Sequence, residues 1–408
     1  MQPIGGIMIF ILQLAIVAQS WKIEFRCYTQ KDDPAVQKFT VDHEKKLDDF
    51  KNFNDSFKKG FHRNASTIIL IHGFKANADS WPETAKNKLL GEIPGVNVIT
   101  VDWRKGAEMS FLKLWRAFNY PRAAKNTHPV GKQIARFINS LVNQGYIDNV
   151  NNVHLVGHSL GAQAAGYACM EYTEEYFSQA ETEKAEKKQE NGIIGRLTGL
   201  DPAEPHFETT VYNWLQKRSL GRRGNQNVIQ FLSWVIGLKR KYPKCFSPIY
   251  KDAARFVDII HTSSLGMKFS VGHADFYPNG GHKMPSCDHV NGLAKRKNLC
   301  NHSMAHKYWV ESIADLKQFS AYSCTNYEHF KQDCNTTDAM TQNIMGYHSK
   351  KIQTQSFYLD TTSTPPYWEV CPPNTGRNNS ETLQQFGNQN PNQKSEYDSE
   401  CPAEFDYS

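Results

Sequence analysis

The stretch of sequence that decides the fold reads VHLVGHSLGAQAAGYA and spans residues 153–168. Its first four residues favour a buried β-strand, and its last seven, rich in alanine, favour an α-helix. The turn between them reads GHSLG, which is a G-x-S-x-G pattern. Such a strand–turn–helix lifts the serine above the sheet, and its glycines permit a turn that larger residues would block. We therefore predict Ser159 as a nucleophile; the alternative is a glycine-rich joint with an incidental serine.

Apolar segments on both sides of this stretch predict further buried strands. They lie at residues 67–71, 98–101, 193–200 and 256–260. Continuous apolar strands separated by helical segments are typical of a buried, mainly parallel sheet. A helix is expected over residues 129–143, where apolar residues recur at nearly the helical period. We therefore predict the α/β class, with a mainly parallel central sheet flanked by helices, as in the α/β-hydrolase fold.

A serine hydroxyl needs a base, and the base needs an acid that orients it. In α/β-hydrolase folds the acid and then the histidine follow the serine along the chain. Asp201 stands directly after the predicted strand 193–200, where this order requires an acid. Asp258 lies inside its own predicted strand and is interpreted as structural, and Glu204 lies three residues further along the loop. Asp201 is therefore the predicted acid.

The pattern alone does not select the histidine. Candidates downstream of the acid are His261, His273, His282, His289, His302 and His306. His302 follows a cysteine by two residues, and a disulfide there could fix its loop.

Two backbone N–H groups are expected to stabilise the oxygen that becomes negative during attack. One belongs to Leu160, directly after the serine. The other belongs to Phe74, in the segment Ile71-His72-Gly73-Phe74 that ends the predicted strand 67–71. The alternative for His72-Gly73 is an ordinary turn at the end of a strand.

Charge is distributed unevenly along the 408 residues. Their net charge is +6 and 39 % of them are hydrophobic, which excludes wholesale disorder and falls short of a dedicated nucleic-acid binder. Residues 209–251 contain nine Lys or Arg and no acid, whereas residues 371–408 contain two basic and six acidic residues. We therefore expect no nucleic-acid partner, and the local basic segment fits a lipid surface better.

The first twenty residues contain no charged side chain, and residues 7–18 form an apolar run. A membrane-spanning helix needs about 20 such residues, so we predict a signal peptide over residues 1–20 and a secreted, extracellular chain. Five glycosylation sequons fit this route: Asn54, Asn64, Asn301, Asn335 and Asn378.

A single catalytic domain is expected over residues 21–370. Insertions are expected at about residues 174–191 and 209–251, and a polar, disordered tail over residues 371–408. The second insertion is interpreted either as an interfacial element or as a surface loop whose apolar centre packs on the body; we favour the loop.

Taken together, these motifs resemble the pancreatic lipase family. The matching segments run in order through residues 22–368, at 71–74, 101–103, 157–162, 198–205, 256–262, 272–281, 300–302 and 345–348. The resemblance implies a triad of Ser159, Asp201 and His302, with Phe74 and Leu160 as oxyanion donors. It thus selects His302 among the histidines, and it implies an extracellular lipid esterase that needs no organic cofactor.

The resemblance also implies two disulfides. Cys287–Cys300 would close the base of a lid of twelve residues, Asp288–Leu299, and Cys324–Cys334 would be the next pair. Cys169, in the helix after the serine, is expected to be a buried free thiol. The short lid and a short neighbouring loop resemble the phospholipase A1 branch of the family.

Two departures from the larger family members change what is expected of partners and metals. The 38 polar residues from Cys371 onward cannot build a C-terminal β-sandwich domain, so colipase is not an expected partner. Residues 249–255 contain one carboxylate beside two cations, which is a poor calcium site. We expect no metal and no cofactor.

The expected activity is the release of fatty acid from a glycerophospholipid or an acylglycerol at a lipid–water interface, with peripheral membrane contact. One alternative is a triacylglycerol lipase of the same family. Another is a non-catalytic lipid-binding or yolk-storage relative. A His/Cys metal site over residues 282–306 is a further alternative, but its spacing matches no standard zinc pattern.

Overall fold

The computed structural model describes residues 21–30, 37–44, 50, 53–108, 119–180, 192–204, 207, 247–290, 294–314, 319–334 and 342–368. The predicted signal peptide, residues 209–246 of the basic insertion and the predicted tail lie outside these ranges. The predictions made for them therefore stay predictions.

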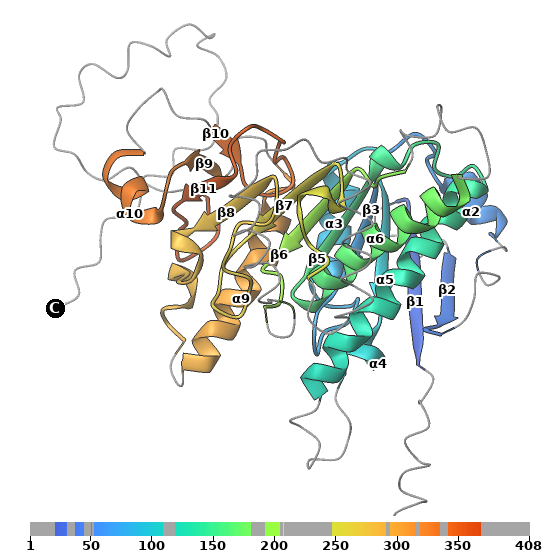
Figure 1. Cartoon of the computed structure of the whole chain (residues 1–408), viewed down its shortest axis with the longest axis horizontal. Coiled ribbons are helices and arrows are strands. Elements are labelled where there is room, and N and C mark those ends of the chain that lie inside the picture. Colours follow the sequence, from blue (N-terminus) through green and yellow to red (C-terminus); the bar gives the residue numbers. More distant parts are fainter. Residues whose placement is uncertain are drawn as a thin grey trace, which may run out of the picture.

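One sheet runs the length of the molecule, from β2 at one end to β10 at the other (Figure 1). Within the described residues its eleven strands follow the order β10-β9-β11-β8-β7-β6-β5-β3-β4-β1-β2. The centre is parallel, from β4 (Asn97–Asp102) through β3 (Thr67–Ile71), β5 (Val153–His158), β6 (Arg196–Leu200), β7 (Phe256–Ile260) and β8 (Ala274–Pro278) to β11 (Ser356–Leu359). Antiparallel strands complete both ends: β1 (Lys22–Tyr28), β2 (Gln37–Asp42), β9 (Ser320–Ser323) and β10 (Gln342–Ile344).

Helices cover both faces of the sheet. On one face α5 (Asn119–Asn143) and α6 (Leu160–Ala180) pack against each other (Figure 1). On the other lie α3 (Trp81–Glu92) and α9 (Ala294–Glu311). Shorter helical segments are α2 (Asp55–Gly60), α4 (Arg104–Ala107), α10 (Tyr327–His329), Val150–Asn152, Lys251–Ala253, Asn279–Gly281, Pro285–Cys287 and Phe330–Cys334. The predicted mainly parallel sheet flanked by helices is confirmed, and the fold is that of the α/β-hydrolases.

The central strands are apolar throughout because both of their faces are buried. In β3 every residue is buried: Ile69 and Ile71 join the core beneath α5 and α6, whereas Ile68 and Leu70 join the core beneath α3 and α9. The parallel strands all end at one edge of the sheet, which is where open α/β sheets place their ligand sites.

Several element boundaries differ from the sequence-based expectation, among them those of β6, α5 and α6. β6 begins at Arg196 instead of residue 193, and Gly195, just before it, passes so close to Asn151 that a Cβ there would lie 2.0 Å from the Asn151 carbonyl oxygen. Helix α5 begins at Asn119, ten residues before the expected start, and the buried Ala123 extends its apolar face past Pro129. Helix α6 runs to Ala180, so the first part of the segment 174–191 continues this helix.

Candidate active site

Ser159 stands in the turn between β5 and α6. Its φ of 57° lies in the left-handed region that non-glycine residues rarely adopt, and it is buried. A Cβ on Gly157 would lie 2.3 Å from the Gly161 carbonyl oxygen, and one on Gly161 would lie 2.2 Å from the Ile71 carbonyl oxygen. Both positions therefore require glycine. The tight turn expected from the sequence is present, at the carboxyl edge of the sheet.

Asp201 and His302 meet at the same edge. Asp201 follows β6 and is fully buried, and His302 lies on α9. His302 Nδ1 and Asp201 Oδ2 are 2.5 Å apart, and an ionised carboxylate only accepts, so Nδ1 carries the proton. The other oxygen, Oδ1, accepts the backbone N–H groups of Thr262 at 2.8 Å and Ser263 at 3.2 Å. The carboxylate thus orients the ring and leaves Nε2 as its basic nitrogen.

Other candidate histidines have different partners. His261 Nε2 contacts Asp275 Oδ1 at 2.8 Å. His273 Nδ1 accepts the Val257 N–H at 3.0 Å. Among the candidates within the described ranges, the structure brings His302 to Asp201.

Asp258, the competing acid, is bound elsewhere. Its two oxygens accept Nε and Nη2 of Arg196, both at 2.9 Å, and Oδ1 also accepts the Thr198 hydroxyl at 2.8 Å. Asp258 is fully buried, and the Arg196 side chain is 16 % exposed. This geometry agrees with the interpretation of Asp258 as a structural acid.

Asp258→Asn is expected to lower the free energy of unfolding by about 3–5 kcal/mol, because it leaves the mostly buried Arg196 guanidinium without its counter-charge. The hydrolytic rate for each titrated active site should stay at the wild-type value. Denaturant unfolding and active-site titration measure the two quantities. Normal stability together with a large loss of kcat would instead mark Asp258 as the triad acid.

The two expected oxyanion donors flank Ser159. Leu160 is the first residue of α6, and the first N–H groups of a helix have no partner within it. Phe74 follows Gly73, where a Cβ would lie 2.9 Å from the Ser159 Cβ. The Phe74 backbone therefore passes directly beside the serine, and glycine at position 73 allows that approach.

Two residues of this site were missed by sequence reasoning. Ser263 donates its hydroxyl to Asp201 Oδ2, the oxygen that also contacts His302. His158 packs its ring 4.5 Å from that of His302, and its Nε2 lies 3.0 Å from the His302 carbonyl oxygen. Burial, assisted by nearby His302 and His306, holds the pKa of His158 well below its ordinary value, so its ring is neutral. Its place beside the serine within the G-x-S-x-G pattern was the available signal.

A disulfide ties the start of α9 to the segment that follows β8. Cys287 and Cys300 are bonded, with their Cα atoms 5.8 Å apart, which confirms that pair. Cys324 is disulfide-bonded as well, but the side chain of Cys334 lies outside the described part, so that pair stays a prediction. Cys169 is a buried free thiol, as expected.

Removal of the Cys287–Cys300 bridge by a double alanine variant is expected to lower the free energy of unfolding by about 3 kcal/mol, because the bridge restricts the conformations of the unfolded chain. The cysteines are 13 residues apart, and Cys300 precedes His302 by two residues on α9. Chemical denaturation of both proteins under non-reducing conditions measures the change. An unchanged midpoint would show that the bridge contributes nothing to stability.

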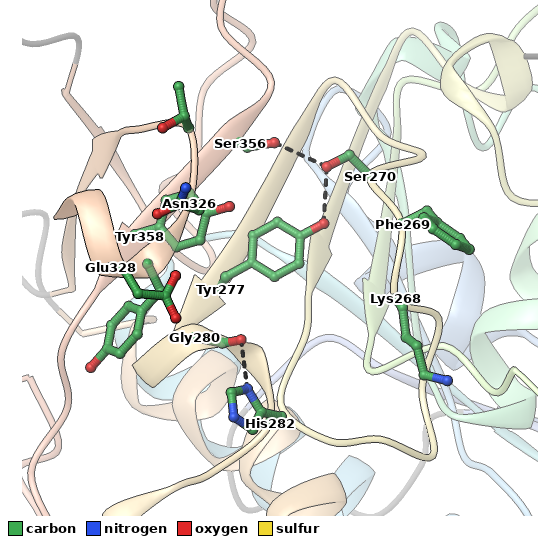
Figure 2. A pocket seen from close by; sticks show the side chains of 12 residues that line it. Lys268, Phe269, Ser270, Tyr277, Gly280, His282, Asn326, Glu328, Ser356 and Tyr358 are labelled. Carbon is green, nitrogen blue, oxygen red and sulfur yellow. Dashed lines mark hydrogen bonds between the residues drawn. The ribbon is translucent and has the colours of Figure 1, made fainter. Parts of the chain in front are cut away.

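A surface pocket of about 440 Å³ has none of the three triad candidates in its lining (Figure 2). Tyr277 and Tyr358 line it. The Ser270 hydroxyl bonds Tyr277 OH at 2.9 Å and the Ser356 hydroxyl at 3.0 Å.

In the part of the chain that the structure describes, no group of three His, Cys, Asp or Glu side chains could hold a metal ion. No helix there is long and apolar enough to cross a membrane.

Comparisons with known proteins agree with this architecture. The sequence model of the lipase family matches residues 12–214 and 246–367; the unmatched segment between them falls inside the predicted second insertion. Pancreatic lipase-related protein 2 of Bos taurus is 32 % identical over 332 residues, which are 74 % of this chain and 57 % of that protein. Pancreatic triacylglycerol lipase of Cavia porcellus is 29 % identical over 370 residues, with coverages of 83 % and 63 %.

A third relative, inactive pancreatic lipase-related protein 1 of Homo sapiens, is 30 % identical over 328 residues and covers 74 % of this chain and 57 % of its own. This chain therefore spans less than two thirds of the length of these three relatives. An esterase structure from Pyrobaculum calidifontis covers 63 % of this chain and 70 % of its own, at 14 % identity and a TM-score of 0.27, which adds no argument. The match of the family model over most of the sequence shows that the chain belongs to the pancreatic lipase family.

Proposed function

We propose that this protein is a serine hydrolase that releases fatty acid from an ester lipid through Ser159, Asp201 and His302. The observation that carries the proposal is the 2.5 Å contact between His302 Nδ1 and Asp201 Oδ2, at the sheet edge where Ser159 stands in its strained turn. An acid that orients a histidine near a serine held in a tight turn is the arrangement that acyl transfer requires.

The reaction proceeds in two steps. His302 Nε2 takes the Ser159 proton while the hydroxyl oxygen attacks the ester carbonyl, and the N–H groups of Leu160 and Phe74 stabilise the negative oxygen. The imidazolium then gives its proton to the leaving alcohol, which breaks the ester bond and leaves an acyl-serine. A water molecule, deprotonated by His302, releases the fatty acid by the same route. Asp201 stabilises the imidazolium in both steps.

For the substrate we propose a glycerophospholipid, with hydrolysis of the phospholipase A1 type. The lid segment between Cys287 and Cys300 is short and basic. Lys295 and Arg296 are exposed on the first turn of α9, whereas Lys297 pairs with Asp288 at 2.6 Å. Exposed cations beside the active site favour a phosphate headgroup over an uncharged glyceride.

Secretion is proposed for two reasons. The apolar run over residues 7–18 supports a signal peptide. A disulfide at the base of the lid is stable in an oxidising compartment.

The test compares the purified protein on phosphatidylcholine vesicles and on a triacylglycerol emulsion. We expect faster fatty-acid release from the vesicles, from the sn-1 position. Preference for the emulsion would support the triacylglycerol lipase alternative. If neither lipid is hydrolysed and a serine probe does not label Ser159, the result would support a non-catalytic protein. One relative is itself named an inactive lipase-related protein.

A further inference from the structure

The loop between β7 and β8, residues 262–272, encloses the carboxylate of Asp201. Its first two N–H groups, from Thr262 and Ser263, donate to Asp201 Oδ1. Further along, a Cβ on Gly266 would lie 2.4 Å from the same oxygen. The loop therefore packs directly on the acid of the triad.

The Ser263 hydroxyl reaches the other oxygen of this carboxylate. It donates to Asp201 Oδ2, which also accepts His302 Nδ1–H, and Ser263 Oγ lies 3.4 Å from that nitrogen. The Leu265 N–H donates to Ser263 Oγ at 3.1 Å, so an acceptor position of the hydroxyl is occupied and its proton is free to point at the carboxylate. Ser263 is 4 % exposed, which excludes bulk water as a substitute donor.

The rest of the loop is fixed as well. His261 Nδ1 lies 2.7 Å from the Met267 carbonyl oxygen, and its Nε2 contacts Asp275. Asp275 also accepts the N–H groups of Val271 at 3.1 Å and Gly272 at 2.9 Å. Because these hydrogen bonds to His261 and Asp275 fix the middle and the end of the loop, the hydroxyl of Ser263 stays in place.

We propose that Ser263 is a positioning residue of the triad. Its hydroxyl and His302 Nδ1–H both donate to Asp201 Oδ2. The hydroxyl thereby fixes the orientation of the carboxylate and limits the basicity of the His302 imidazole. The proposal rests on the function proposed above. A carboxylate oxygen that accepts a second hydrogen bond stabilises its imidazolium partner less strongly, because part of its negative charge is neutralised by the other donor. Removal of the hydroxyl should leave Asp201 a stronger partner of His302 and make the imidazole more basic.

Two further histidines lie near His302, and burial keeps both of them neutral. Burial holds the pKa of His158 well below its ordinary value and lowers that of His306, one turn along α9, to about 3. The positive charge of Lys307 also lowers the pKa of His306. Glu204, three residues after Asp201, pairs with Lys268 at 3.4 Å. A change in the titration of His302 on alteration of Ser263 therefore reports the shared carboxylate.

The test follows the imidazole of His302 by NMR in the full-length protein, with the signal assigned by its absence from His302→Gln. In Ser263→Ala the pKa of His302 should rise by about half a unit to one unit, because the carboxylate loses a competing donor. The acid limb of the kcat/KM profile should move to higher pH by the same amount. At the plateau kcat should fall severalfold with KM unchanged.

Two conservative variants and one control complete the design. Ser263→Thr keeps the hydroxyl and should restore the wild-type titration. Ser263→Cys keeps the volume with a weaker donor and should give a smaller shift in the same direction, which serves if the alanine variant does not fold. Ser270→Ala removes a serine hydroxyl of the same loop that bonds Tyr277 and Ser356 (Figure 2), and it should titrate like wild type.

An unchanged or lowered pKa of His302 in Ser263→Ala or Ser263→Cys would overturn the proposal. The proposed function and the proposed role of Ser263 can be refuted independently of each other. Wild type that hydrolyses no ester would overturn the proposed function, while the NMR titration still reports whether Ser263 acts on His302.

Discussion

Ser159→Ala is expected to lower kcat/KM for a soluble ester by about 10⁶-fold, leaving a residual rate from the oxyanion donors alone. The methyl group of alanine cannot form the acyl intermediate, so the two-step route is lost. The change keeps the Cβ, and the left-handed backbone at position 159 is already imposed by the neighbouring glycines. The fold should therefore persist, and the loss should be in kcat.

Hydrolysis of p-nitrophenyl butyrate by the two proteins measures this loss. Ser178→Ala is a matched control, since this exposed serine lies on the same helix and bonds the Glu175 carbonyl oxygen. It should retain the wild-type rate. A Ser159→Ala protein with more than a small fraction of the wild-type rate would remove Ser159 from the mechanism.

Asp201→Asn is expected to lower kcat by about 10⁴-fold near neutral pH with little change in KM. The backbone N–H groups of Thr262 and Ser263 require an acceptor, so the amide oxygen should take the place of Oδ1. The amide NH₂ then faces His302 Nδ1, which must become an acceptor. The proton of the neutral ring moves to Nε2, and His302 can no longer accept the proton of Ser159.

Two measurements separate this effect from unfolding. The thermal midpoint of Asp201→Asn should stay within a few degrees of wild type, because the amide and carboxylate have the same shape. The double variant with Ser159→Ala should be no slower than Ser159→Ala alone, since triad members act as a unit. A further loss in the double variant would mean that Asp201 acts independently of the serine.

Local patterns predicted the parts of this site that depend on backbone geometry. The G-x-S-x-G turn, the acid directly after β6 and the glycine before Phe74 are each set by residues close in sequence. The sheet was predictable for the same reason, because strands buried on both faces are apolar without interruption. Boundaries were less predictable: β6 starts at Arg196 and not at residue 193, and the close approach of Gly195 to Asn151 just before it cannot be seen in the sequence periodicity.

Residues of the site that meet only through contacts between distant parts of the sequence could not be identified from sequence patterns alone. Asp201 and His302 are 101 residues apart in sequence, and several downstream histidines were equal candidates until the family resemblance selected one. Ser263 was missed because a serine in a short loop carries no motif; its role depends on the path of residues 262–272 around the carboxylate. His158 stands within the G-x-S-x-G pattern, but its contact with His302 on α9 could not be seen in the sequence.

The central claim is that Ser159 is a nucleophile activated by His302 and Asp201. A fluorophosphonate probe tests it most directly, because the probe forms a covalent bond only with an activated serine. We predict one modified site per wild-type molecule, mapped to Ser159 by mass spectrometry, and strongly slowed modification in Asp201→Asn. A wild-type protein that is folded but unmodified, or modified at another residue, would contradict the account.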